Sequence, residues 1–314
     1  MRTARISLLL AALLVTGGCG SSSSTPPPPP PCLCGGTCAA DGSCVACDGS
    51  LTLDSANPAD AASALGICRN LVSAHWVQPD GSPPPAGVSF DLGHGILPSF
   101  GSNVTPQEGS RLLALSTGTA RRPSDPGYVA GVTGLDKGYA SGLPAGFPAA
   151  VPACAGQFLG GGFDGVGLEV TLTVPTGAAG LAIDYKFYSS DWPDFVCSNF
   201  NDQFIIRLSP PPPTQPDGNL ALDLQGGPVG PYPSFIDECS CTGLCVQGGL
   251  DFLCGLGTAG LVGTGFEAGA ASSWRTATAA VRAGDTVALR FAIWDSGDGS
   301  YDSTVLLDHF RWTR

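Results

Sequence analysis

The sequence has few charged residues and very little histidine. Charged residues make up 13% of the 314 positions, with 14 Lys and Arg against 26 Asp and Glu, and there are three His. The net charge of −12 leaves no basic face for phosphates, which excludes nucleic acid as an expected partner. Neither a Gly-x-Ser-x-Gly elbow nor a His-Glu-x-x-His zinc motif is present. We therefore expect a protein that is not an enzyme.

Apolar runs long enough to span a bilayer, about 20 residues, are also missing. The short run Ile6–Val15 follows a positively charged start, and the small residues Thr16–Gly18 lead into Cys19. This is the arrangement of a lipoprotein signal, although Thr16 stands where Leu is usual. We predict a signal peptide over residues 1–18 and lipidation of Cys19, with an ordinary cleaved signal as the alternative.

Cysteine, by contrast, is abundant and odd in number, with 13 copies. Lipidation of Cys19 leaves twelve, which fall into two sets of six. In an exported chain such even sets predict disulfides, and the alternative is a zinc site that uses the spacing Cys44-x-x-Cys47. The expected disulfide cysteines are Cys32, Cys34, Cys38, Cys44, Cys47 and Cys68 in the first set and Cys154, Cys197, Cys239, Cys241, Cys245 and Cys254 in the second.

The chain after Cys19 begins as a tether. Gly20–Thr25 is a flexible Ser-rich linker, and Pro26–Pro31 is a semi-rigid polyproline spacer. Residues 19–31 are therefore predicted to be a lipid anchor with a stalk. Because Gly20 rather than Asp follows the lipidated cysteine, we expect the outer membrane, with the protein displayed at the cell surface.

A Cys-rich segment follows the stalk. Residues 32–56 hold five cysteines in a stretch too short to bury a core, so we predict a small disulfide knot. Cys68 is the expected sixth partner, which would attach the knot to the main domain.

The remaining residues, 57–314, read as one β domain. The stretch Asn57–Gly66 has a capping Asn, a Pro at the first position and a run of alanines, which predicts one short helix. Short apolar runs bounded by Gly, Pro, Asp or Asn follow, and these predict an all-β antiparallel sandwich or jelly roll. The expected strands are Leu71–Val77, Arg111–Ser116, Leu168–Val174, Leu181–Tyr188, Gln203–Leu208, Thr286–Trp294 and Ser303–Trp312.

Two acidic segments, 188–204 and 294–307, lie beside predicted strands. Carboxylate and Asn oxygens crowded at strand ends suit Ca²⁺, although the second segment lacks the rhythm of an EF-hand loop. The alternative is that these residues hydrogen-bond their own backbone in turns. The candidate ligands are Asp191, Asp194, Asn201, Asp202, Asp295, Asp298 and Asp302.

The same segments resemble choice-of-anchor L domains. Ser189–Val196 with Phe200–Phe204, and Ala292–Asp298 with Asp302–Leu307, are similar to motifs of that family, and the resemblance covers about residues 57–314. It implies an extracellular β-rich module of a bacterial surface protein, with no catalytic residues. Cys197 inside the first motif departs from the family pattern, and we expect a disulfide to hold that loop.

Aromatic residues accompany both acidic segments: Tyr188, Trp192 and Phe195 near the first, and Trp294 and Tyr301 near the second. Aromatic rings beside ordered polar groups are typical of glycan sites, although such residues also fill cores. We therefore predict a non-catalytic module for binding or adhesion, with a glycan or a surface protein as ligand. The alternatives are a polysaccharide hydrolase that uses the Asp pairs and a structural envelope protein.

Overall fold

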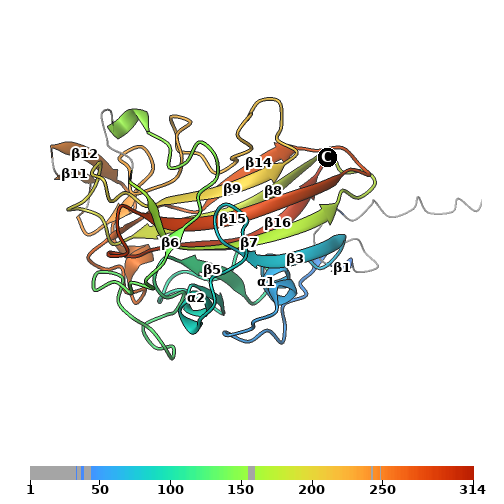
Figure 1. Cartoon of the computed structure of the whole chain (residues 1–314), viewed down its shortest axis with the longest axis horizontal. Helices are drawn as coiled ribbons and strands as arrows, with labels where there is room; N and C mark the ends of the chain where they lie inside the picture. Colours follow the sequence, from blue (N-terminus) through green and yellow to red (C-terminus); the bar gives the residue numbers. More distant parts are fainter. Residues whose placement is uncertain (1–32, 34–36, 39–43, 155–159, 242, 248) are drawn as a thin grey trace, which may run out of the picture.

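The computed structural model of the chain describes residue 33 and residues 37–38, 44–154, 160–241, 243–247 and 249–314 (Figure 1). The predicted signal peptide and stalk, with Cys19, Cys32 and Cys34, lie outside the described residues. Within the described residues, no helix is long and apolar enough to cross a membrane.

Two antiparallel sheets form the body of the molecule (Figure 1). The larger has seven strands, six of them in the order β10-β13-β8-β16-β5-β4, and β14 also pairs with β8. Its strands are β4 (His94–Leu97), β5 (Leu112–Ser116), β8 (Gly180–Ser189), β10 (Glu238–Cys239), β13 (Ala270–Ala271), β14 (Arg275–Ala280) and β16 (Ser303–Thr313).

The smaller sheet has five strands in the order β3-β7-β15-β9, with β6 paired to β7. Two separate hairpins, β1–β2 and β11–β12, complete the strands. The smaller sheet contains β3 (Leu71–Val77), β6 (Ala140–Ser141), β7 (Gly162–Thr173), β9 (Gln203–Ser209) and β15 (Thr286–Ser296), and the hairpins are β1 (Thr37–Cys38), β2 (Cys44–Val45), β11 (Gly243–Gln247) and β12 (Leu250–Cys254). The predicted all-β antiparallel sandwich is confirmed.

Alternating apolar residues hold the two sheets together. Leu168, Val170 and Leu172 on β7 face the same core as Leu181 and Ile183 on β8, and all five are fully buried. Each fully buried aliphatic side chain of this kind stabilises the fold by about 1.5–3 kcal/mol. The period-two pattern that predicted these strands is therefore the pattern that fills the core.

A second apolar cluster covers the outer face of the larger sheet. Phe100 and Phe266, from two loops, pack against Tyr188 of β8. Strand β8 is consequently buried along its whole length, on both of its faces. This cover explains why Tyr188 lies in the interior.

The predicted helix is present as α1 (Pro58–Ala64). The Asn57 side chain accepts a hydrogen bond from the Ala59 N–H and caps the helix, and Gly66 (φ +89°) supplies the left-handed conformation after its end. A second helix, α2 (Val88–Leu92), was not predicted, because five residues are too few for a helical period to show. Two short 3₁₀ turns, η1 (Pro152–Cys154) and η2 (Ala259–Leu261), complete the helical segments.

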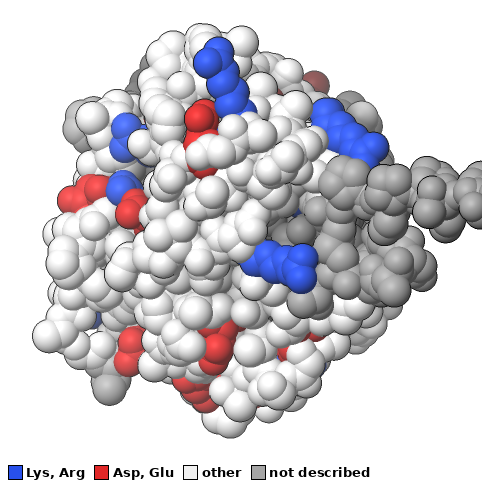
Figure 2. Space-filling model, turned by 90° about the vertical axis from the view of Figure 1, so that its right-hand side faces the viewer, with Lys and Arg blue, Asp and Glu red and all other residues white. Residues whose placement is uncertain are grey.

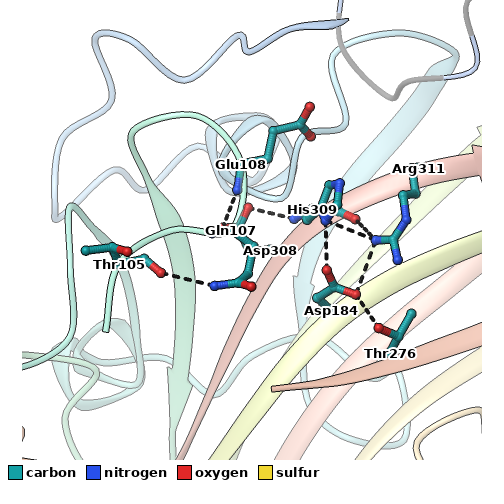
Figure 3. A network of polar contacts seen from close by, with 8 residues as sticks. All are labelled: Thr105, Gln107, Glu108, Asp184, Thr276, Asp308, His309 and Arg311. Carbon is teal, nitrogen blue, oxygen red and sulfur yellow. Dashed lines mark hydrogen bonds and ion pairs between the residues drawn. The ribbon is translucent and has the colours of Figure 1, made fainter. Parts of the chain in front are cut away.

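A polar network crosses three neighbouring strands of the larger sheet (Figure 3). The Asp184 carboxylate on β8 accepts a hydrogen bond from Thr276 of β14 at 2.6 Å and lies 2.8 Å from His309 Nδ1 of β16. Arg311 Nη1 also pairs with Asp184 Oδ1, at 3.2 Å. His309 sits at the irregular point of β16 with a φ of +55°. The network therefore links the bulged strand β16 to its neighbour β8 and, through Asp184, to β14 on the other side of β8.

His94, at the start of β4, is enclosed by aromatic residues. Its ring stacks on Trp76 with centroids 3.8 Å apart, and its exposed fraction is 3%. Burial, with the charges of Arg121 and Lys137, lowers the pKa of His94 to about 3. The folded protein therefore holds a neutral imidazole here at every pH above that value.

Stability should consequently fall as the pH falls from 6.5 toward 3, because the unfolded chain takes up a proton that folded His94 refuses. Between about pH 7 and pH 5 this group alone removes about 2 kcal/mol from the free energy of unfolding. His94→Phe keeps the aromatic stack and should flatten the profile by that amount in urea unfolding at the two pH values. An unchanged slope in the variant would contradict the neutral, buried His94.

Candidate functional site

Disulfides tie the loops of the molecule to its strands. Cys47–Cys68 attaches the Cys-rich segment to the main domain, as predicted. Cys154–Cys197 holds the first acidic loop, also as predicted, and Cys239–Cys254 and Cys241–Cys245 staple the β11–β12 hairpin. Cys38 and Cys44 lie opposite each other in the β1–β2 hairpin.

The structure brings the two acidic segments to one end of the sandwich. Asp191 follows β8 and Asp302 precedes β16, and these strands are neighbours in the larger sheet. Asp202 precedes β9 and Asp295 lies near the end of β15, which are neighbours in the smaller sheet. Antiparallel pairing places the end of one strand beside the start of the next, so all four carboxylates gather at this end.

These four acidic side chains are buried, with exposed fractions of 0% for Asp191 and 1% for the other three. Backbone N–H groups donate hydrogen bonds to some of their carboxylate oxygens. The Ser296 N–H donates to Asp202 Oδ1 at 3.2 Å, and the Leu135 N–H donates to the Asp302 carboxylate. The Asp202 N–H in turn donates to Asp191 at 3.4 Å.

Several of their oxygen atoms have no partner. Asp191 Oδ1, Asp202 Oδ2 and both carboxylate oxygens of Asp295 are buried without a hydrogen bond, as are the hydroxyls of Ser296 and Ser303. A buried polar atom left unpaired costs about 1–3 kcal/mol, and more when it is charged. The Asp202 and Asp295 side chains also lie close enough to interact, which opposes the rise that burial causes in the pKa of Asp202 and adds to the rise in that of Asp295. Either a shared proton or a bound cation can therefore account for these oxygens.

Several carboxyl groups of the cluster lie close together and away from water, which disfavours their charged forms. Burial raises the pKa of Asp191, Asp202 and Asp295 well above the usual range, and each also feels the charge of another of the three. Burial raises the pKa of Asp302 to about 7, opposed by Lys137.

Lys137 is the cation among these acids, and the sequence did not single it out. It is buried, and its Nζ donates to the carbonyl oxygens of Ser116 at 2.9 Å and Asp164 at 3.1 Å. Burial lowers its pKa to about 8 against the charges of Asp302, Asp295 and Asp164. Asp164, also missed, accepts from the Lys137 N–H at 2.7 Å and holds this segment in place.

The other three predicted metal ligands do not belong to this cluster, although Asn201 is buried, with an exposed fraction of 1%. Asn201 serves its own loop: its side chain accepts from the Cys197 N–H and donates to the carbonyls of Phe195 and Ser198. Asp194 and Asp298 are exposed. For Asn201 the turn chemistry considered from the sequence is what the structure shows.

The buried carboxylates do not form a closed metal cage as they stand. Among the described residues, one set of His, Cys, Asp or Glu ligand atoms converges within 4.8 Å, and it consists of Cys239, Cys241, Cys245 and Cys254. Those sulfurs belong to the two disulfides of the hairpin. A cation at the acidic end would therefore have to draw its carboxylates closer together.

A groove opens at the surface beside the buried acids. It has a volume of about 330 Å³ and is lined by Tyr139, Phe163, Asp136 and Asp298, with the glycines of the second acidic segment. The Tyr139 hydroxyl donates to the Gly165 carbonyl, so the ring is held in a fixed orientation. Tyr139, Phe163 and Asp136 lie outside both acidic segments, and no sequence signal separated them from ordinary strand and turn residues.

The predicted aromatic residues divide into two groups. Trp192, Trp294 and Tyr188 are buried and fill the interior. Phe195 and Tyr301 are half-buried, with ring centroids 4.9 Å apart, and they join the two acidic segments near the surface. Sequence proximity to an acidic loop therefore did not distinguish a surface ring from a core ring.

Elsewhere the surface offers little charge. Figure 2 shows a mostly uncharged face on which a few Lys and Arg side chains are spaced apart, with Asp and Glu side chains beside some of them.

Replacing Lys137 with Met should lower the free energy of unfolding by about 3–5 kcal/mol, because the buried acids would lose their compensating charge. Urea unfolding of the Lys137→Met variant measures this. Arg282→Met, at an exposed position, is the matched control and should change stability by less than about 0.5 kcal/mol. Equal effects of the two substitutions would show that Lys137 does not neutralise the cluster.

Comparison with known proteins gives little further guidance. No protein-family model and no curated protein matches the sequence. A solved structure of TmCBM61 in complex with beta-1,4-galactotriose aligns with 71% of this chain and 82% of that chain, at 7% identity and a TM-score of 0.24. A likeness this low carries no argument about the ligand of this chain.

Proposed function

We propose that the chain is a lipid-anchored surface protein whose β domain binds a glycan without catalysis, with Ca²⁺ stabilising the acidic end of the sandwich. The observation that carries the proposal is the pairing of two features at one end: an open groove with aromatic and acidic walls, and a buried carboxylate cluster directly beneath the same loops.

The cluster supports Ca²⁺ through its chemistry. The unpaired atoms are oxygens of Asp191, Asp202 and Asp295, which are the hard ligands that Ca²⁺ takes. A divalent cation would offset two negative charges and give those oxygens a partner. The seven predicted ligands reduce in this proposal to these three and Asp302.

The groove supports a glycan through its shape and lining. Rings of Tyr139 and Phe163 can receive the apolar face of a sugar, and the carboxylates of Asp136 and Asp298 can accept hydrogen bonds from hydroxyls. Its volume of about 330 Å³ is at the lower end of small-molecule sites, which suits one or two sugar rings.

Burial argues against the rival hydrolase. The four clustered acids have exposed fractions of 0–1%, so a polysaccharide bond cannot reach them, although glycoside hydrolysis needs its two carboxylates on either side of that bond. Asp194 and Asp298, which are exposed, remain available to a ligand.

The anchor belongs to the proposal as well. The signal-like start and Cys19 support lipidation, and the acidic motifs support membership of the choice-of-anchor L family. Both rest on the sequence. Together they would place the β domain on the outer membrane, raised above it on the stalk of residues 19–31.

Calcium should raise the midpoint of thermal unfolding and EDTA should lower it. Mass action gives about 2.7 kcal/mol of added stability when free Ca²⁺ is 100 times its dissociation constant. The Asp295→Asn variant should lose the response, whereas Asp251→Asn, on the exposed hairpin, should keep it. If neither Ca²⁺ nor EDTA changed the midpoint of thermal unfolding, the calcium site would be refuted.

Glycan binding is tested on an array of surface polysaccharides, with soluble products assayed in parallel. The wild-type protein should bind at least one glycan and release no reducing ends. Asp298→Ala should weaken that binding by about tenfold or more, since it removes a charged wall of the groove, and the exposed Asp194→Ala should not. Release of reducing ends would overturn the non-catalytic assignment, and equal binding by the two variants would move the site elsewhere.

A further inference from the structure

A second cavity lies on another part of the molecule, between the loop before α1, helix α2 and strand β4. It encloses about 270 Å³. Its walls are Asp54, Ala56, Asp91, Leu92, His94 and Arg121. None of these residues belongs to the acidic end or to its groove.

The position of Arg121 is determined by its contacts with the backbone. Its Nη1 donates to the carbonyl oxygens of His94 at 2.7 Å and Ala120 at 2.9 Å, and its Nη2 pairs with the Asp54 carboxylate. Gly95 makes this possible, because a Cβ there would lie 2.8 Å from Arg121 Nη1 and 2.4 Å from the Ala120 carbonyl. The guanidinium is therefore held in a fixed place that any larger residue at position 95 would disturb.

The opposite wall is equally fixed. The Trp76 ring stacks on His94, and Trp76 Nε1 donates to the Ala56 carbonyl at 3.1 Å. Phe90 contacts the His94 ring edge-on. These contacts fix the His94 ring and the backbone at Ala56, whereas the Asp54 and Asp91 side chains at the cavity are exposed.

Two polar atoms in these walls have no partner. His94 Nε2 and Arg121 Nε are both buried without a hydrogen bond, in residues whose exposed fraction is 3% each. Asp91 Oδ1, on an exposed side chain, lies 3.9 Å from His94 Nε2, too far for a hydrogen bond. Buried nitrogens of this kind are normally paired, so the cavity lacks the groups that would satisfy them.

The charges around the cavity define the ligand. A cationic ligand would be repelled by Arg121, and an anionic ligand would be repelled by Asp54 and Asp91. A ligand with donors alone would leave Arg121 Nε unpaired, and one with acceptors alone would leave the Asp91 carboxylate unpaired. Hydroxyl groups both donate and accept, and they satisfy all of these atoms without bringing a charge.

We infer that this cavity binds a small, neutral, polyhydroxylated ligand of the monosaccharide class, held by His94, Arg121 and Asp91. The apolar walls of Leu92 and Ala56 receive its carbon skeleton. The volume, just below that of typical small-molecule sites, fits a single sugar ring rather than a chain. The inference is independent of the groove, which has different walls.

The scarcity of histidine makes the test direct, because the imidazole NMR spectrum of the full chain contains signals from three residues, His75, His94 and His309. Methyl glycosides of glucose, galactose and mannose are titrated to about 50 mM, which covers the millimolar affinities expected of single sugars. At least one glycoside should shift the His94 signals saturably while those of His75 and His309 stay in place.

Variants separate this cavity from the groove. Asp91→Ala, at an exposed side chain that the fold does not need, should weaken the saturable shift at least threefold. His94→Phe, made together with Asp298→Ala so that the groove does not contribute, should abolish glycoside binding seen by calorimetry. Asp298→Ala should leave the His94 shift unchanged even if the groove binds sugar. His94 signals that do not move with any of the three glycosides, or that move equally in Asp91→Ala, would overturn the inference.

Discussion

Four carboxylates lie in the interior at one end of the sandwich, where β8 and β15 finish and β9 and β16 begin. An isolated buried carboxylate is so costly that it is normally paired, protonated or bound to a metal. Lys137 supplies one positive charge near Asp295 and Asp302, and several oxygens of the cluster still have no hydrogen-bond partner. The arrangement of the loops at this end depends on how the remaining charge is neutralised.

Several covalent links of the structure are placed where that constraint is strongest. Cys154–Cys197 holds the first acidic loop against a neighbouring segment, and the β11–β12 hairpin beside it carries two more disulfides. Between the two sheets, alternating Leu, Val and Ile residues supply the packing, and Cys47–Cys68 ties the Cys-rich segment to the main domain. The Cys154–Cys197 link thereby limits the motion of a loop at the acidic end.

Much of the fold could be predicted from the sequence, because period-two patterns such as Leu168–Val174 bury one face and cannot be satisfied otherwise. The strand β14 was missed since its alternating Ala and Thr carry little apolar contrast. The gathering of Asp191, Asp202, Asp295 and Asp302 was anticipated, but their burial was not, because burial depends on loops from distant parts of the chain. Lys137, Asp164 and the groove residues Tyr139 and Phe163 gave no local signal, since their roles arise only when separate segments meet.

In the proposed function, a divalent cation neutralises the buried carboxylates. The most direct test of this is elemental analysis of the purified protein by mass spectrometry after equilibration with Ca²⁺ and removal of free ions. The account predicts one bound Ca²⁺ per chain, lost in the Asp295→Asn variant and retained in Asp251→Asn. A wild-type protein that carries no calcium would contradict it, and would leave protonation as the means by which the fold tolerates these four acids.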